Sequence, residues 1–384
     1  MNYDNNIKNI CKLITNASAD VVLEFRYDFI NFLKSTNQIE KYLIRKHFMN
    51  LEWNCGSLRV LGVLQEIQLL SATEYILSLK DSAQIQLILN DFLETEYDLL
   101  LQLFKSSFYD NFNNTRINMY LDESLRCLFL DLLKNPTLND LSYLNVFNNK
   151  LPESLLLHVM KKHIQVIMDL HDSNIKSAFQ NYSIWINNSV DNYKFTKDLY
   201  VKLLKFCEQA AINYLFNASI KEHFKEWKFY LILMQTIVSR CTNECSVYIR
   251  KYFKTRLLQI SNNPCKNAML HLLLTARAAT ATTEDIDKNI DSYAKWYKQN
   301  IGEMKYVLDK EQFLSILTLM EECISYETEL EYIEIYTQIS IAPPVLCSKA
   351  VQSYKAKCKI HLTRLKNNIR PVEMYDSILI DDSD

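Results

Sequence analysis

The chain has 384 residues, of which 48% are hydrophobic, 23% are charged and only three are glycine. Its 43 basic and 45 acidic residues nearly cancel, which argues against a globally basic nucleic-acid binder. A chain this long and this apolar can bury a sizeable core, so a predominantly disordered protein is excluded.

The scarcity of glycine restricts the fold and the chemistry. Globular proteins average roughly 7% glycine, and tight turns and phosphate-binding loops use it where the backbone needs positive φ. The spacing of Gly56, Gly62 and Gly302 fits neither GxGxxG nor a Walker-type loop. Strand-rich folds and nucleotide-binding enzymes are therefore disfavoured.

Apolar residues recur at helical spacing along the whole chain, and no segment shows the sustained alternation of a strand. The pattern predicts an all-α protein. The predicted helices are 4–16, 20–35, 38–52, 57–70, 72–80, 82–108, 115–134, 138–147, 152–171, 174–187, 196–216, 218–240, 243–261, 264–278, 283–300, 310–323, 327–338 and 344–367.

Several of these helices have recognisable start signals. Three pairs have the spacing of a capping box, in which a side-chain acceptor meets a residue that reaches back to it. The pairs are Ser71 with Glu74, Asp81 with Gln84, and Asp309 with Gln312. Each pair predicts the first turn of a helix.

Short polar links separate the predicted helices and force neighbours to run antiparallel. So many antiparallel helices cannot surround one core, and we expect an irregular α-solenoid of helix pairs. In architecture this resembles the HEAT and armadillo class, with degenerate repeats. We expect a helical repeat array over 1–280, a C-terminal helical subdomain over 281–368 that continues the stack, and a flexible acidic tail over 369–384. Residues 275–283, which lack large apolar side chains, read as a hinge or a frayed helix end.

The residues that most often carry catalysis or bind metals show no supporting pattern. His158, His163 and His171 occupy different faces of the predicted helix 152–171, and His163 falls on its apolar stripe as a core residue. Cys241 and Cys245 lack the second ligand pair of a zinc site. Gly-X-Ser-X-Gly is absent from the sequence. We therefore expect no enzyme, no cofactor and no metal.

An aromatic stripe in the predicted helix 218–240 has two possible interpretations. Trp227, Tyr230 and neighbouring apolar residues recur at helical spacing. Exposed, such a stripe could stack on nucleic-acid bases, whereas buried it is what a central core helix requires. The length and apolarity of the helix favour core packing.

Charge is segregated near the C-terminus. Residues 321–334 carry six acids and no base, whereas 343–370 carry seven bases and no acid. Pro344 suits the first turn of the last helix. On that helix a basic ridge lies beside the packing stripe, formed by Lys355, Lys359, Lys366 and Arg370. The ridge either pairs with the preceding glutamate-rich helix or contacts phosphates or an acidic partner.

The final residues form an acidic segment with three consecutive aliphatic side chains, Ile378, Leu379 and Ile380. This segment resembles a SUMO-interacting motif, which adds a β-strand to the edge of the small ubiquitin-like modifier. The resemblance implies that the three aliphatics fill an apolar groove while Asp381, Asp382 and Asp384 meet basic residues at its rim. The alternative is that the tail packs on the protein's own helices.

Function follows from these expectations by elimination. We expect a non-enzymatic scaffold or adaptor subunit of a protein complex. The resemblance of the tail to a SUMO-interacting motif further implies SUMO or SUMO-modified proteins as partners and a nuclear role such as genome maintenance. The alternative is a nucleic-acid-binding helical domain that uses the basic helix 349–370. Ten cysteines without paired spacing, and no apolar run of ~18 residues, predict an intracellular protein, nuclear or cytoplasmic, without a membrane span.

Overall fold

The computed structural model describes residues 5, 7–12, 19–109, 114–135, 141–187, 193–221, 223–280 and 292–369. Within these ranges the protein is helical, and no strand is present. One isolated parallel bridge joins Ser173 to Glu226. The prediction of an all-α protein is confirmed.

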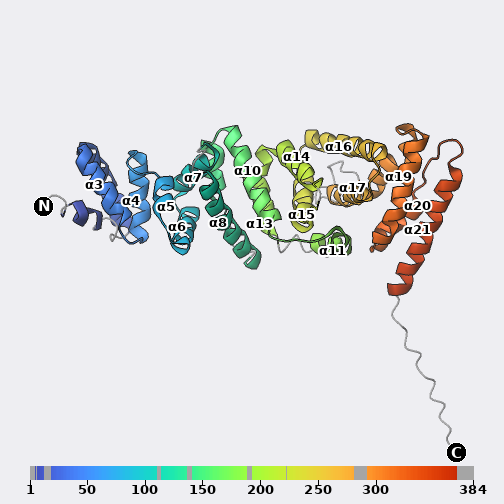
Figure 1. Cartoon of the computed structure of the whole chain (residues 1–384), viewed down its shortest axis with the longest axis horizontal. Helices are drawn as coiled ribbons and strands as arrows, with labels where there is room; N and C mark the ends of the chain where they lie inside the picture. Colours follow the sequence, from blue (N-terminus) through green and yellow to red (C-terminus); the bar gives the residue numbers. More distant parts are fainter. Residues whose placement is uncertain are drawn as a thin grey trace, which may run out of the picture. The chain divides into compact units, whose positions relative to one another are not determined.

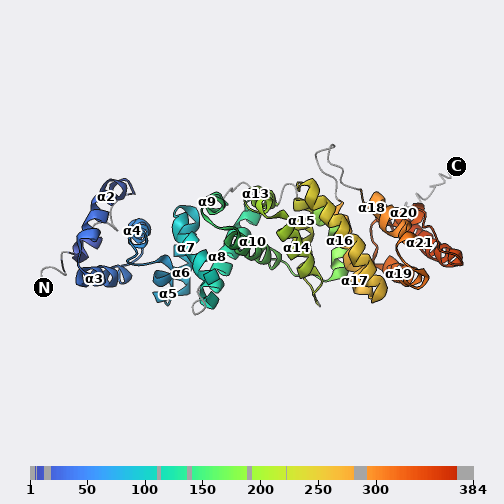
Figure 2. The same cartoon turned by 90° about the horizontal axis from the view of Figure 1, so that it is seen from above.

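The chain forms two compact units, and it passes between them more than once. Unit 1 comprises Met1–Leu170 and Asp191–Cys207, and unit 2 comprises His171–Val190 and Glu208–Asp384. The domain boundary expected near residue 280 falls inside unit 2, where α17 (Lys266–Ala279) and α19 (Lys310–Cys323), from either side of it, are in contact. Figures 1 and 2 colour the chain from blue at the N-terminus to red at the C-terminus.

Unit 1 is built from α-helices joined mostly by short links. Its core contains leucine, isoleucine and phenylalanine from α4 to α10. Contacts link α7 to α5, α6, α8, α9 and α10, which makes α7 the centre of the unit. The helices described in unit 1 are α2 (Ala19–Ser35), α3 (Gln38–Met49), α4 (Cys55–Glu66), α5 (Ala72–Ser78), α6 (Ser82–Glu94), α7 (Tyr97–Tyr109), α8 (Asn114–Lys134), α9 (Tyr143–Lys150), α10 (Glu153–Met168), α13 (Lys194–Lys202) and the 3-10 turn η1 (Leu204–Phe206).

The core of unit 2 contains α15, in which nearly every side chain is buried. Trp227 and Tyr230 lie within it, so the prediction that this aromatic stripe is core is confirmed. The helices described in unit 2 are α11 (Ile175–Asn187), α14 (Glu208–Ser219), α15 (Trp227–Val238), α16 (Asn243–Asn262), α17 (Lys266–Ala279), α18 (Tyr293–Tyr297), the π-helix η2 (Lys298–Gly302), the 3-10 turns η3 (Met304–Tyr306) and η4 (Ile324–Tyr326), α19 (Lys310–Cys323), α20 (Leu330–Gln338) and α21 (Ser348–Ile369).

Alternate helices of unit 2 run parallel, as stacked antiparallel pairs require. Trp227 and Tyr230 of α15 meet His271 and Thr275 of α17 in the same order along both helices. The helices α14 and α16 are also parallel, because their contacts follow the same order along both helices. When helices i and i+2 are parallel, the helix between them runs the other way, and each pair buries its apolar stripe against the next. Unit 2 therefore has the packing of an α-solenoid, as expected.

Two of the three predicted capping boxes are present. Ser71 with Glu74 and Asp309 with Gln312 make both reciprocal hydrogen bonds. Asp81 caps α6 by accepting from the amide of Ala83, but Gln84 does not reach back. The local sequence thus fixes where these helices begin.

Two long predicted helices are each broken in the structure. The predicted helix 82–108 is α6 followed by α7, and α6 ends at its C-cap Thr95, whose φ of −136° and ψ of −38° leave the helical region. The predicted helix 196–216 is α13, η1 and α14. Its second break falls between Cys207 and Glu208, where unit 1 gives way to unit 2. Helical periodicity continues across both breaks, so it could not reveal them.

Two helix starts were predicted too early. The helix predicted from residue 218 begins at Trp227, after His223 adopts a positive φ of 63°. The last helix begins at Ser348, after Leu346 adopts a φ of 69°. Right-handed helix cannot pass through that region of backbone space. Pro344 therefore lies before the helix and not in its first turn.

Candidate functional site

The histidines of α10 do not form a catalytic or metal-binding group. His158 Nε2 lies 2.8 Å from Ser107 Oγ, the distance of a nucleophile and its base. However, the Ser107 hydroxyl is buried and donates to the Phe104 carbonyl, so it accepts from His158. His171 lies beyond the end of α10 and belongs to unit 2, which corrects its placement on the predicted helix.

His163 is a core histidine, as predicted. Its Nδ1 lies 2.7 Å from the Val159 carbonyl, which can only accept, so Nδ1 carries the proton. Nε2 then accepts from the Tyr143 hydroxyl at 2.6 Å. Burial lowers the pKa of His163 to about 4. The ring is therefore neutral and fully satisfied, and it joins α9 to α10.

Cys241 and Cys245 are the cysteine pair that the sequence singles out. Both are buried, and the side-chain hydrogen bond with Cys241, together with burial, raises the pKa of Cys245. Within the described ranges no group of three or more His, Cys, Asp or Glu side chains is placed to hold a metal ion.

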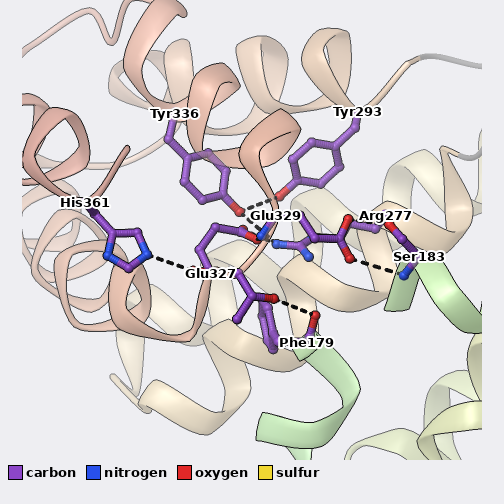
Figure 3. A network of polar contacts seen from close by, with 9 residues as sticks. Phe179, Ser183, Arg277, Tyr293, Glu327, Glu329, Tyr336 and His361 are labelled. Carbon is purple, nitrogen blue, oxygen red and sulfur yellow. Dashed lines mark hydrogen bonds and ion pairs between the residues drawn. The ribbon is translucent and has the colours of Figure 1, made fainter. Parts of the chain in front are cut away.

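The most concentrated polar cluster of unit 2 surrounds a buried arginine, Arg277, near the end of α17 (Figure 3). Arg277 and Glu327 are each 1% exposed, and their side chains form an ion pair. Arg277 also approaches the Tyr336 hydroxyl, which lies 3.0 Å from that of Tyr293. One charge pair thus brings together α17, α18 and the segment before α20.

Aromatic rings enclose the guanidinium of Arg277. Its central carbon lies 3.8 Å from the ring centroid of Tyr332 and 4.7 Å from that of Phe179. A cation held over aromatic faces away from water gains about 2 kcal/mol or more per close contact. Burial alone would lower the pKa of Arg277, but the Glu327 carboxylate raises it well above its ordinary value. Arg277 therefore stays charged at every pH at which the protein folds.

The segment that carries Glu327 is fixed by further hydrogen bonds, drawn as dashed lines in Figure 3. His361 of α21 donates through Nε2 to the Glu327 carbonyl at 2.7 Å. Thr328 donates to the Phe179 carbonyl at 3.1 Å, and Glu329 accepts from the Ser183 amide. In a regular helix the carbonyl of 179 would pair with the amide of 183. The 328–329 segment thus engages both groups of α11.

This network is suited to holding helices together. Arg277 and Glu327 are sealed from solvent and form an ion pair with each other, although Nε and Nη1 of Arg277 have no hydrogen-bond acceptor, whereas a catalytic acid or base must reach a substrate. Removing one partner of a buried pair leaves an uncompensated charge, so the two side chains depend strongly on each other. The cluster is a structural lock of unit 2.

Sequence reasoning missed this lock. Residues 275–283 were interpreted as a hinge or frayed end, but Thr275–Thr280 are helical or helix-capping and buried, and residues 281–283 lie outside the described ranges. A lone base within a run of alanines, matched by the acid-only stretch 321–334, was the signal available in the sequence.

The lysines of the basic ridge lie in different environments in the structure. Contacts between α20 and α21 run in opposite order along the two helices, so the pair is antiparallel. Lys366 pairs with Glu334 at 2.7 Å, and Lys355 donates to the carbonyls of Tyr336 and Ile339 at the end of α20. Burial lowers the pKa of Lys355 to about 8. Lys359 is exposed.

The remaining candidate residues lie outside the described ranges. They are Arg370 and the tail residues Ile378, Leu379, Ile380, Asp381, Asp382 and Asp384. Among the helices that are described, none is both long and apolar enough to cross a lipid bilayer.

Together these features define a class of protein: an all-α stack of antiparallel helix pairs whose buried polar groups join helix to helix. Comparison with protein families then gives the particular family. The family described as "Fanconi anaemia group A protein N terminus" matches residues 47–368. The match covers most of both units, and the chain belongs to this family. No curated protein matches the chain at a significant level.

Proposed function

We propose that this chain is a non-enzymatic scaffold or adaptor subunit of a nuclear genome-maintenance complex. The observation that carries the proposal is the family match over residues 47–368. The family is named for a Fanconi anaemia group protein, and stacked helix pairs present extended surfaces suited to holding other proteins. The polar clusters described above join helices and are not open to a substrate, which agrees with a binding role.

Affinity purification of the full chain from its native cells tests this proposal. We expect other proteins to co-elute in fixed stoichiometry on size-exclusion chromatography and to remain after nuclease treatment, because the contacts are between proteins. Mass spectrometry identifies the co-eluting chains. A full chain that elutes only as a folded monomer, without reproducible partners, would contradict the proposal.

The finer part of the proposal concerns the C-terminal tail. Its resemblance to a SUMO-interacting motif supports a role in recruiting SUMO or SUMO-modified proteins. Replacing Ile378, Leu379 and Ile380 by alanine in the full chain should abolish binding to the purified modifier, measured by calorimetry. A matched control replaces Val372 and Met374, which lie outside the aliphatic run. Equal binding by both variants would remove this part of the proposal.

An alternative function is nucleic-acid binding through α21. The exposed side chains of Lys349, Lys359 and Arg364 favour it, since they lie on the solvent side of the helix. Reversing these three charges should weaken binding to a labelled DNA or RNA duplex and flatten the salt dependence of the affinity. Reversing Lys366, which is paired with Glu334, serves as the comparison. No binding at low salt would eliminate this alternative.

A further inference from the structure

The outer face of α21 is an exposed surface of unit 2. The helix packs on α19, α20 and η4, and the side chains that it buries fully are Tyr354 and Cys358. Figure 1 shows α20 lying alongside it. The positions on the opposite side recur every three or four residues, so they form one stripe along the helix. They are all exposed: Lys349, Gln352, Ala356, Ile360, Thr363 and Asn367.

The outer face of α21 carries positive charge that has no counter-charge in the described part of the chain. Lys349 lies on the stripe, and Lys359 and Arg364 flank it; all three are exposed, and none has an acidic partner among the described residues. The bases of α21 that are engaged are Lys355 at the end of α20, Lys357 with Glu321, and Lys366 with Glu334. Residues 343–370 contain no acid, so the face has a net positive charge.

Residues 371–384 have the complementary composition. They carry five acids and no base, and the acids lie on both sides of the aliphatic run 378–380. The face of α21 has the corresponding order, because Ile360, which is 54% exposed, lies between Arg364 and Lys349 along the helix. Each exposed ion pair is weak, but complementary charges in matching order fix the register of a contact. Charge and order together favour this segment as the occupant of the face.

The covalent connection through residue 370 makes such a contact intramolecular. α21 ends at Ile369, and its outer face from Arg364 to Lys349 is about 22 Å long at ~1.5 Å per residue. The chain from Ile369 to Asp381 spans up to about 40 Å when extended, which is enough to return to Lys349. Two segments joined by a short link meet at an effective concentration in the millimolar range, so weak contacts suffice to hold them together.

We propose that residues 371–384 fold back along the outer face of α21, antiparallel to the helix. The acids before the aliphatic run face Arg364, and the run itself covers Ile360. The acids after the run face Lys349 and Lys359. Salt weakens the contact, because charges exposed to water are screened over about 10 Å at 0.1 M ionic strength.

This contact regulates access to both binding sites considered above. It covers the aliphatic run that the SUMO modifier would bind, and it covers the exposed bases that a nucleic acid would bind. A partner of either site has to displace the tail from the helix, so its apparent affinity falls in proportion to the fraction of chains that are open. This consequence rests on the proposed function, whereas the contact itself does not.

Carbodiimide coupling of the purified full chain tests the inference, because this reagent joins a lysine amine to a carboxylate in contact with it. Mass spectrometry of the monomer should identify Lys349 and Lys359 joined to acids of 371–384. The ion pair between Lys366 and Glu334 is the internal control and should couple under the same conditions. A mixture of light and heavy isotope-labelled chains separates coupling within one chain from coupling between copies.

Two variants weaken the contact without changing any group that the reagent joins. Arg364→Gln removes a charge that faces the tail, and Ile360→Ser removes the apolar contact. Each should lower the yield of tail coupling about threefold or more. Val247→Ser on α16 changes an exposed aliphatic side chain of similar exposure and should leave the yield unchanged. All three side chains are exposed, and thermal melting checks that the fold is intact.

Several results would overturn the inference. One is a tail that does not couple to α21 while Lys366 couples to Glu334, and another is coupling only between different copies. Unchanged yields in Arg364→Gln and Ile360→Ser would have the same meaning. A labelled DNA duplex that binds equally well with and without residues 371–384 would also overturn the inference, since the bases would then be uncovered.

The purified SUMO modifier separates this inference from the proposed function. Replacing Lys349, Lys359 and Arg364 by glutamine should raise the affinity for the modifier about threefold or more, because it frees the aliphatic run. If the tail couples to α21 but no variant binds the modifier, that part of the proposed function fails while the folded-back tail stands. If the modifier binds the unchanged chain and the triple variant equally, the inference fails while the function stands.

Discussion

Unit 1 and unit 2 each bury a polar side chain at the centre of their packing, and they satisfy it in opposite ways. In unit 1, His163 is neutral and its two ring nitrogens have one partner each. In unit 2, Arg277 keeps its charge, with Glu327 as its counter-ion and aromatic rings around it. A neutral group needs only hydrogen bonds when buried, whereas a charge needs a partner of opposite sign. Unit 2 should therefore be far more sensitive to losing one partner.

The largest expected effect is from Arg277→Met, which leaves the Glu327 carboxylate buried without its counter-ion. The free energy of unfolding of unit 2 should fall by about 3–5 kcal/mol. The double variant Arg277→Met/Glu327→Leu removes both charges and should recover much of this loss. Amide hydrogen exchange, resolved by peptide, measures the two units separately.

Unit 1 is the internal control for this experiment. Exchange in α7 and α10 should not change in either variant, since neither residue belongs to that unit. A loss below ~1 kcal/mol for the single variant, or a double variant as unstable as the single one, would show that the pair is not a lock.

The second effect is a pH dependence of unit 1. The unfolded chain protonates His163 near its ordinary pKa of 6.5, whereas the folded chain does so only at about 4. The unfolded state therefore binds more protons between these values, and the stability of unit 1 falls as the pH drops through this window. The stability lost across the whole window is roughly 3 kcal/mol. Hydrogen exchange of α10 at several pH values measures it.

His163→Phe keeps a ring in the core and should flatten this pH dependence. His271 of unit 2 is the matched control, because burial also lowers its pKa to about 4. His271→Phe should leave the pH profile of unit 1 unchanged. An unaltered slope in His163→Phe would assign the acid sensitivity to other groups.

A smaller effect is expected from Tyr143→Phe. The change leaves His163 Nε2 buried without its donor, which costs about 1–3 kcal/mol in unit 1. Tyr97→Phe removes a hydroxyl that donates to the Glu94 carbonyl at an exposed site, and it should cost much less. Urea unfolding followed by exchange of unit 1 peptides compares the two. Equal costs would mean that the ring of His163 is satisfied in some other way.

The smallest effect is expected at the exposed ion pair between Lys366 and Glu334. Lys366→Ala should change the stability of unit 2 by less than about 1 kcal/mol, since water screens the pair. Comparison with Arg277→Met in the same assay separates buried from exposed charge. A cost as large as that of Arg277→Met would mean that the α20–α21 pair depends on this contact.

How much of the fold the sequence could predict depends on the range of the signal. The Ser71 and Asp309 capping boxes join residues three apart, so both were predictable. The break between α13 and α14 was not, because the apolar spacing continues across Cys207 while the chain changes unit. The start of α21 was missed because Leu346 takes a positive φ in a turn closed by the Cys347 amide, which donates to the Pro344 carbonyl, and leucine does not signal such a turn.

The candidate sites also differ in whether a local sequence pattern could predict them. His163 lies on a helical apolar stripe, and that position alone places it in the core. Arg277 and Glu327 are fifty residues apart, and no local pattern indicates that they meet.

By itself, the sequence determined that this protein is all-α, that neighbouring helices pair antiparallel, and where several helices begin. Those properties follow from glycine content, apolar periodicity and capping side chains, which act over a few residues. Only the tertiary structure decided that the chain divides into two units, that Arg277 is enclosed with Glu327, and that Lys355 and Lys366 pair internally. These depend on which distant residues share a low-dielectric interior, where the energy of a charge is set by its neighbours in space.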